Sequence, residues 1–401
     1  MGKATKQLMK SLIFGSIGGV AIATFGIARH FASRVVTPLQ SPNEPLEVLD
    51  FMQDVSDAET EHKSTITLSR GEDSDLPGNF SLIFDGGSGH AQIGEVVLQN
   101  ETTVTRRLIK IISGDLRPGV KARLTGWWYD KPEDLAGQVK HVNVDSELGP
   151  MPAWLISPSQ SSQKHVVIHV HGRGARKEET LRGVAPISEL GVDSLIIGYR
   201  NDADCPKSLD GKYGLGFDES RDVIAAVKYA KSLGFSEFTL FGWSMGATAS
   251  LQALRYLNRN EPNLALSVKS LILESPAVDW PEVLKHHADI ARVPRFIADI
   301  AAWIISKTPI LVGLRTAIPL KNLTSESFAD DLSTPTLIIV SEQDTFVPFE
   351  GALNLAHTRQ DLVRLFRAPS GEHVKIWNEN EETWNQEVSD FMVRNSHIKN
   401  L

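Results

Sequence analysis

The chain has 401 residues, of which 41% are hydrophobic and 22% are charged, and its net charge at pH 7 is −8. This length leaves room for more than one globular domain. Because the chain is acidic and has no basic cluster with interleaved aromatic residues, nucleic acid is not expected as a partner. Cys205 is the single cysteine, which excludes an intramolecular disulfide and a cysteine-based metal site.

The first predicted element is an apolar segment near the N-terminus. Residues 11–28 form an uncharged run of 18 residues, preceded by three lysines and followed by Arg29 and Arg34. Such a run is near the minimum for a helix that spans a bilayer and longer than a typical signal-peptide core. We therefore expect residues 1–35 to be a single-span membrane anchor, with its N-terminus in the cytoplasm and the catalytic domain outside. A cleaved signal peptide, which would leave a secreted protein, and a buried soluble helix are the alternatives.

The next region, residues 36–150, is predicted to be a linker followed by a small β-rich domain. Its first ten residues are polar and carry three prolines, which is typical of a linker. Short strands are expected at 108–112, 121–127 and 139–144, separated by turn residues. No catalytic constellation is visible here, so the sequence assigns this region no role.

From residue 151 the pattern changes to strands alternating with helices. Helical patterns such as residues 218–233 separate short, nearly continuous apolar runs at 153–156, 166–170, 192–198, 238–241, 270–273, 336–340 and 363–366. This pattern predicts a mostly parallel sheet with helices on both faces, and we assign it to residues 151–401. Ligands of such sheets bind beyond the carboxyl ends of the strands, so catalytic residues should follow strands.

An apolar stretch interrupts this alternation at residues 278–330. Residues 283–314 are predicted to be helical and are strongly apolar. They are interpreted as a cap that covers the active site and binds an acyl chain or another apolar group. The alternative is that they pack the last crossover of the fold.

The sequence Gly242-Trp-Ser244-Met-Gly246 follows the strand expected at 238–241 and precedes a predicted helix at 247–257. A serine hydroxyl is a poor nucleophile and must be held clear of the sheet, within reach of a base. A sharp strand-to-helix turn achieves this and needs small residues on both sides of the serine. We therefore predict that Ser244 is a nucleophile; an ordinary glycine-rich turn is the alternative.

A base and an acid follow the last two predicted strands. Asp344 lies just after the strand at 336–340, and His373 lies in a Pro/Gly-containing loop after the strand at 363–366. The chain order Ser, Asp, His is the one expected when all three rise from one parallel sheet. His373 would take the proton of Ser244 and return it to the leaving group, while Asp344 would orient the ring and stabilise the imidazolium.

Other acids and histidines of the chain could compete for these roles. Glu342 is the nearest rival to Asp344. His169 lies within a predicted buried strand and is interpreted as a core residue, and His357 is expected on the helix between the last two strands. His286 and His287 lie in the predicted cap, where they could line its pocket.

Acyl transfer also requires donors for the developing oxyanion. The backbone N–H of Met245, directly after the nucleophile, is one candidate. The backbone N–H of Arg173 is the other, because Gly172 and Gly174 let the loop after the strand at 166–170 approach a substrate. The alternative is a tight turn that merely needs glycine. Phosphate binding is disfavoured, since no Gly-Lys-Ser/Thr follows.

Residues 151–395 resemble the α/β-hydrolase superfamily, near its bacterial prolyl-oligopeptidase-like and esterase branches. The resemblance is carried by six motifs: His171-Gly172-x-Gly174, Tyr199-Arg200-Asn201, Glu219-x-x-Asp222, Gly242-x-Ser244-x-Gly246, Asp344-x-x-Val347-Pro348 and Gly371-x-His373. It implies the α/β-hydrolase fold and a Ser-His-Asp mechanism that needs no metal or organic cofactor. It does not cover residues 1–150. Arg173 departs from the family pattern, where a small or apolar residue is usual. With Arg176 it would either attract an anionic part of the substrate or be solvated.

The expected activity is hydrolysis of a carboxylic ester, of a small molecule or a lipid, through an acyl-Ser244 intermediate. A serine peptidase of the prolyl-oligopeptidase-like kind is the second hypothesis, although the large propeller of that family does not fit in the residues before the sheet. A non-catalytic binding protein on the same fold is the third hypothesis, and the complete triad argues against it.

Overall fold

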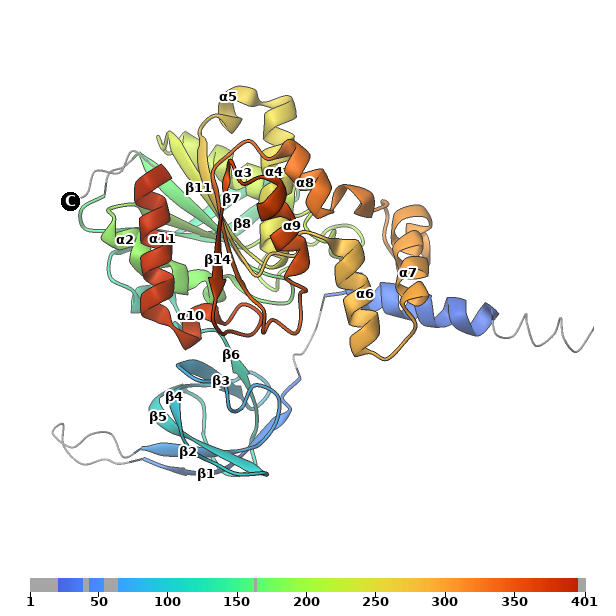
Figure 1. The fold of residues 1–401 in the computed structure, drawn as a ribbon. Coiled ribbons are helices and arrows are strands. Elements are labelled where there is room, and N and C mark those ends of the chain that lie inside the picture. The colour runs from blue at the N-terminus through green and yellow to red at the C-terminus, as the bar shows by residue number, and fades with distance from the viewer. Residues whose placement is uncertain (1–20, 39–42, 54–63, 162–163, 396–401) are drawn as a thin grey trace, which may run out of the picture.

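The computed structural model describes residues 21–38, 43–53, 64–161 and 164–395. These residues form a helix at 21–36, a small β-barrel and a larger α/β domain (Figure 1). Residues 1–20 of the predicted membrane anchor and residues 39–42 of the predicted linker lie outside them. Within the described ranges, no helix combines the length and the hydropathy needed to cross a bilayer.

The predicted β-rich region is a closed barrel of six strands. They are β1 (Leu46–Met52), β2 (Thr65–Ser69), β3 (Phe80–Phe84), β4 (Gly89–Gln99), β5 (Thr103–Ser113) and β6 (Lys121–Thr125). All neighbours pair antiparallel, in the order β1-β2-β5-β4-β3-β6. Alternating residues such as Leu46 and Val48, or Ile66 and Leu68, point inward and fill the core. Closure leaves the barrel without an exposed sheet edge.

The larger domain is built on an eight-stranded sheet in the order β14-β13-β12-β11-β9-β10-β8-β7. Its strands are β7 (Gln138–Ser146), β8 (Gly149–Ser157), β9 (His165–Val170), β10 (Asp193–Ile197), β11 (Glu237–Trp243), β12 (Val268–Glu274), β13 (Thr336–Ser341) and β14 (Val363–Ala368). Each of the seven runs predicted as strands of this domain forms one. The strands from β9 to β14 pair in parallel, whereas β7 and β8 are antiparallel.

One boundary differs from the expectation. The strand predicted at 139–144 was placed in the N-terminal region, but it is β7, the edge strand of the large sheet. It pairs with β8 along its whole length, from Gln138 with Ser157 to Ser146 with Gly149. The α/β domain therefore starts before residue 151, because a tight antiparallel hairpin adds one more strand to the sheet.

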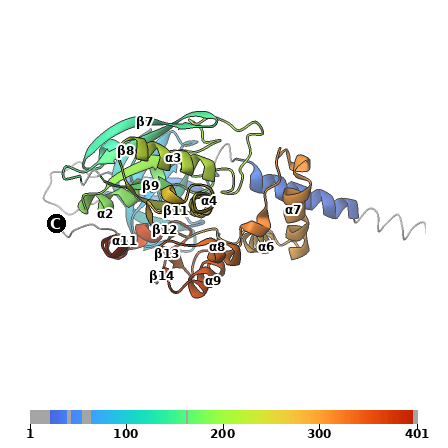
Figure 2. The ribbon, with the colours of Figure 1, turned by 90° about the horizontal axis from the view of Figure 1, so that it is seen from above.

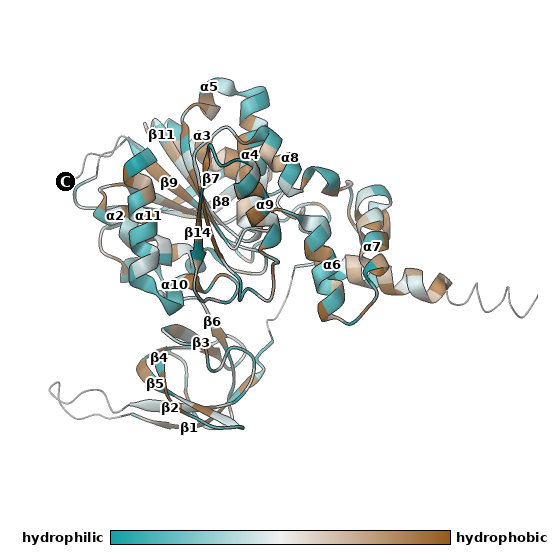
Figure 3. Ribbon diagram, in the orientation of Figure 1, coloured by the Kyte–Doolittle hydropathy of each residue, from teal (hydrophilic) through white to brown (hydrophobic). Residues whose placement is uncertain are grey.

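Helices cover both faces of the sheet (Figures 1 and 2). One face packs against α2 (Val184–Glu189) and α11 (Glu381–Asn395), the other against α3 (Ser220–Ser232), α4 (Met245–Asn260) and α9 (Glu350–Thr358). Hydrophobic residues run along the central strands between these layers (Figure 3). The remaining short helices are η1 (Pro132–Asp134), η2 (Lys177–Gly183), α5 (Pro262–Ala265) and α10 (Ile376–Glu379).

The apolar stretch at 278–330 is helical, as predicted. It contains α6 (Trp280–Ile290), α7 (Arg295–Lys307), η3 (Pro309–Val312), η4 (Leu320–Asn322) and α8 (Ser325–Asp331). Both ribbon views place α6 and α7 beside the helix at 21–36, on one flank of the domain (Figures 1 and 2). Ala28, Ala32 and Val36 of that helix are buried in the same core cluster as the α6 and α7 side chains. The N-terminal helix is thus packed onto the α/β domain.

Candidate active site

Ser244 lies in the sharp turn between β11 and α4, with φ 52° and ψ −116°. A non-glycine residue with positive φ is uncommon and costs backbone energy, which is typical of a nucleophile elbow. The turn tolerates no larger neighbour: a Cβ on Gly242 would lie 2.6 Å from Ala247 Cα, and one on Gly246 would lie 2.0 Å from Val170 O. The two predicted motif glycines are therefore required by contact with the backbone.

The structure brings Ser244, Asp344 and His373 together at the carboxyl ends of β11, β13 and β14. His373 Nδ1 donates to Asp344 Oδ2 at 2.8 Å, and the Ser244 hydroxyl lies 2.9 Å from His373 Nε2. Because Nδ1 carries the proton in the hydrogen bond to the carboxylate, Nε2 is left as the acceptor for the hydroxyl proton. This is the geometry that base-assisted attack by a serine requires.

The carboxylate of Asp344 is held by more than the histidine. Its Oδ1 accepts hydrogen bonds from the backbone N–H of Phe346 at 2.9 Å and of Val347 at 2.8 Å. Burial alone would raise the pKa of Asp344, but His373 and these donors outweigh it and lower the pKa. The rival acid Glu342 instead pairs with Arg367 at an exposed position. The geometry therefore brings Asp344, and not Glu342, to the histidine.

The loop after β9, which was predicted to supply an oxyanion donor, lies against Ser244. A Cβ on Gly172 would lie 3.1 Å from Ser244 Cβ, so glycine allows the close approach, and Gly174 adopts a left-handed φ of 73°. The buried ring of His171 fixes this loop. Its two nitrogens lie 2.9 Å from Gly172 O and 2.8 Å from Asp202 Oδ2.

Both partners of the His171 ring are acceptors, so both ring nitrogens must donate for both contacts to be hydrogen bonds. Burial disfavours the charged ring, but the Asp202 carboxylate and Gly172 O outweigh it and raise the pKa of His171. The Tyr199 ring stacks on the imidazole at 4.1 Å, and its hydroxyl donates to Gly172 O at 2.8 Å. His171 and Tyr199, which belong to two of the motifs shared with the α/β-hydrolase superfamily, thus hold the loop at Gly172 together.

The side chain of Arg173 has a role that the sequence did not predict. Its Nε donates to Val35 O at 2.9 Å and its Nη2 donates to Arg34 O at 2.8 Å. These carbonyls belong to the C-terminal end of the helix at 21–36, where a cation is stabilised by the helix dipole. Arg173 is therefore neither solvated nor turned toward a substrate, and its guanidinium caps the N-terminal helix. Arg176, the second arginine of the loop, lies over the Trp127 ring at 5.8 Å.

Helix α6 of the predicted cap approaches the ring of His373 through Phe346. The His287 ring meets the Phe346 ring edge-on at 4.5 Å, and Phe346 lies 5.1 Å from the His373 ring. His286 Nε2 donates to Thr345 O at 2.9 Å, next to Asp344. Burial lowers the pKa of His287 to about 4, so its ring is neutral near pH 7. The α6 segment thus borders the site.

The other two histidines lie where the sequence placed them. His169 is fully buried in β9, where Nε2 lies 3.1 Å from Ser194 Oγ, and burial lowers its pKa to about 3. His357 is exposed on α9. Neither belongs to the constellation around Ser244.

Sequence reasoning missed the contact between the barrel and the loop that carries His373. Asn378 donates to Asn79 O at 2.8 Å and to Gly126 O at 3.2 Å, and the Asn79 N–H donates back to Asn378 O at 2.9 Å. Lys375 pairs with Asp73 of the barrel domain. These partners are about 250 to 300 residues apart in the chain, so no local motif could have indicated them.

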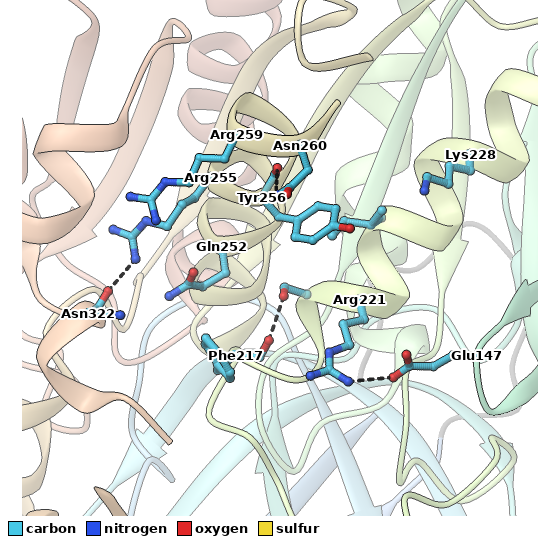
Figure 4. A pocket seen from close by; sticks show the side chains of 12 residues that line it. Glu147, Phe217, Arg221, Lys228, Gln252, Arg255, Tyr256, Arg259, Asn260 and Asn322 are labelled. Carbon is cyan, nitrogen blue, oxygen red and sulfur yellow. Dashed lines mark hydrogen bonds and ion pairs between the residues drawn. The ribbon is translucent and has the colours of Figure 1, made fainter. Parts of the chain in front are cut away.

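A separate cavity of about 540 Å³ lies between α3 and α4 (Figure 4). Its apolar wall includes Phe217 and Tyr256, and no triad residue lines it. The cations around it are engaged: Arg221 pairs with Glu147, Lys228 with Glu261, and Arg259 with Asp331. This cavity is therefore distinct from the site at Ser244.

Comparisons with known proteins gave a family match for the barrel region. A family described as a domain of unknown function (DUF8805) matches residues 54–125, which include β2 to β6 of the barrel. No curated protein matches the chain in sequence.

Solved structures match the larger domain. The esterase Pf2001 of Pyrococcus furiosus superposes in one crystal form with a TM-score of 0.51 at 20% identity, covering 67% of this chain and 94% of the esterase. A second crystal form gives 0.50 at 19% identity, with 67% and 96% covered. Est1E from Butyrivibrio proteoclasticus gives 0.47 at 20% identity, with 64% and 98% covered. At this identity the likeness shows the fold. The larger domain of this chain therefore shares the α/β-hydrolase-like fold of the Pf2001 esterase, a mixed sheet with helices on both faces.

Proposed function

We propose that this protein is a serine hydrolase that cleaves a carboxylic ester through a covalent acyl-Ser244 intermediate. The observation that carries the proposal is the continuous chain of two hydrogen bonds from Asp344 through His373 to the strained Ser244. A structural hydrogen-bond network does not require a serine with positive φ, whereas a nucleophile held clear of the sheet in a sharp strand-to-helix turn does.

The proposed reaction runs in two stages. In the first, Ser244 Oγ attacks the ester carbonyl while its proton passes to His373 Nε2, and Asp344 stabilises the imidazolium. The backbone N–H groups of Met245 and Arg173 receive the oxyanion, at the N-terminus of α4 and in the loop after β9. Collapse of the tetrahedral intermediate breaks the C–O bond, and His373 gives its proton to the leaving alcohol. In the second stage a water molecule, activated by His373, releases the acid by the same steps.

The test is covalent trapping and turnover with the full chain in detergent. A fluorophosphonate should label Ser244 stoichiometrically, and p-nitrophenyl acyl esters should be hydrolysed with a burst of one equivalent. Ser244→Ala should lose both signals, whereas the exposed Ser232→Ala should lose neither. Turnover of aminoacyl amides as fast as esters would favour the peptidase hypothesis instead. An unlabelled, inactive but folded wild type would contradict the proposal.

We further propose that residues 11–28 anchor the chain in a membrane, with the N-terminus in the cytoplasm and the catalytic domain outside. The length of the uncharged run supports this. So does the outer half of the helix at 21–36, where Ile22 and Ile27 are 76% and 49% exposed. Resistance to alkaline carbonate extraction, with the catalytic domain accessible to added protease, is the expected result. Release of a shortened chain into the medium would instead indicate cleavage.

A further inference from the structure

The flank formed by the helix at 21–36, α6, α7 and η3 differs from the rest of the molecule in charge. Residues 280–312 carry four lysines and arginines against three acids, and residues 21–36 carry two arginines and no acid. Two of the acids pair with cations of the same flank, Glu282 with Lys285 and Asp289 with Arg295. The whole chain, in contrast, has a net charge of −8. The flank is therefore a cationic region on an acidic protein.

The same flank exposes large apolar side chains. On α7, Phe296 and Trp303 are 53% and 50% exposed, and with half-buried Ile300 they follow the i, i+4, i+7 spacing of one helix face. Ile310 of η3 is 77% exposed. The opposite face of α7, which includes Ile297 and Ile304, is buried. Hydrophobic residues also gather on the outer part of the N-terminal helix beside α7 (Figure 3).

The direction of the N-terminal helix indicates what covers this flank. Arg29 Nε donates to Leu311 O at 2.7 Å, which ties the middle of the helix to η3. From there the helix runs outward past α7, so that its N-terminal end lies on this flank in both views (Figures 1 and 2). Residues 21–28 are the last part of the uncharged run that begins at residue 11. Residues 11–20 lie outside the described residues, but they precede this end of the helix in the sequence. The membrane anchor proposed above would therefore bring a bilayer close to α7.

We propose that α7 and its neighbours form a second membrane contact, which rests on the surface of an anionic bilayer. This inference depends on the membrane anchor proposed above. Aromatic side chains such as Phe296 and Trp303 favour the interface between headgroups and acyl chains, and basic residues are attracted to anionic lipids. A partner protein is disfavoured, because the anchor would already hold this flank within a few residues of the lipid.

The contact has a consequence for the active site. Because α6 packs beside α7 and reaches His373 through Phe346, a membrane against α7 places the site close to the bilayer surface. Esters that partition into the bilayer would then be concentrated near Ser244. The membrane contact therefore specifies the substrate class of the proposed hydrolase: esters that dissolve in the membrane.

The chain offers a specific labelling experiment. Its single cysteine, Cys205, is buried, and burial raises the pKa of its thiol, so it should react poorly with a maleimide or iodoacetamide dye. Full-length Phe296→Cys and Trp303→Cys proteins are labelled with an environment-sensitive fluorophore and reconstituted in vesicles of phosphatidylcholine and phosphatidylglycerol. Val97→Cys on the barrel and Leu266→Cys after α5 are the matched controls, with exposed fractions of 56% and 74% in the wild type.

The dyes at 296 and 303 should shift their emission to the blue and be quenched severalfold more by spin-labelled lipids than those at 97 and 266. Vesicles of phosphatidylcholine alone should weaken the difference. If the protein floats with the vesicles but all four dyes show the same emission shift and quenching, the second contact is refuted, whereas the proposed anchor is supported. If the protein does not float, both membrane proposals fall. Hydrolysis of p-nitrophenyl butyrate in the same samples tests the hydrolase function independently.

Discussion

Arg173 and Val35 connect the loop beside the nucleophile to the end of the N-terminal helix, through a 2.9 Å hydrogen bond from Nε to a carbonyl 138 residues earlier in the chain. The backbone of Arg173 is a proposed oxyanion donor, whereas its side chain holds the helix. Arg173 thus connects the N-terminal helix, which continues the proposed anchor, to the proposed catalytic centre.

This link predicts the effect of changing the side chain alone. Arg173→Gln keeps the backbone N–H but loses the fork of donors to Arg34 and Val35, so the loop should be less well positioned. We expect kcat to fall about tenfold with little change in KM, because the oxyanion is bound more tightly than the ground state. Arg173→Lys should restore only part of the rate, since an ammonium group cannot reproduce the planar fork.

The control for this prediction is Arg176→Gln, which removes an exposed arginine of the same loop. It should leave kcat within about twofold of the wild type, as expected for a surface contact. If Arg173→Gln instead raises KM for anionic esters without lowering kcat, the arginine side chain binds substrate and does not position the loop.

The acid of the triad can be tested with a matched pair of isosteric changes. Asp344→Asn keeps the hydrogen-bonding shape but favours the wrong tautomer of His373, so kcat should fall by about 10³- to 10⁴-fold. Glu342→Gln removes only an exposed partner of Arg367 and should change the rate by less than about twofold. Pre-steady-state release of p-nitrophenol measures both. Equal losses in the two variants would mean that Asp344 is not the acid.

The contact between the barrel and the His373 loop predicts a role for the barrel in catalysis. A Cβ on Gly78 would lie 2.2 Å from Asn378 O, so Gly78→Ala must push the barrel away from the loop. We expect kcat to fall about tenfold or more, because a shift of about 1 Å in catalytic geometry can cost 10²-fold. Gly119→Ala is the control, since its φ of 87° is as unfavourable for alanine as the 101° of Gly78 but its Cβ would meet no atom within 4 Å.

Both variants should lose about 1 kcal/mol of stability from the left-handed backbone, and Gly78→Ala should lose more, because its Cβ also clashes with the backbone of Asn378. The fall in Tm measures both losses. Only Gly78→Ala should also lose kcat. If kcat is unchanged while the Gly78→Ala protein is folded, the barrel does not position His373.

Some features of the fold and of the site could be predicted from the sequence, and others could not. Ser244, Asp344 and His373 could be found because each follows a recognisable strand and the carboxyl ends of parallel strands share one edge. In contrast, β7 was assigned to the wrong domain because strand pairing is not encoded in the strand itself. Its partner is decided by the short turn between Ser146 and Gly149. The barrel's closure and the Arg173 cap depend on contacts between distant segments, for which a single sequence carries no local signal.

The raised pKa of His171 predicts a pH dependence of stability. Its pKa is raised in the folded protein, so its contribution is complete below the unfolded pKa of about 6.5 and is lost as the pH rises through the folded value. His171→Gln should therefore destabilise the protein more at pH 6 than at pH 9. A loss of about 1.5 to 3 kcal/mol at pH 6 is expected for hydrogen bonds of a charged group.

Urea unfolding of wild type and variant at both pH values measures this difference. The comparison with the wild type at each pH is essential, because burial lowers the pKa of His165 and His169 to about 4 and 3, and both therefore act in the opposite direction. Their effects cancel when variant and wild type are subtracted. His357→Gln, at an exposed position of α9, is the control for loss of a histidine elsewhere in the fold. An equal loss for His171→Gln at pH 6 and pH 9 would mean that the ring is neutral, and that Asp202 does not hold a proton on it.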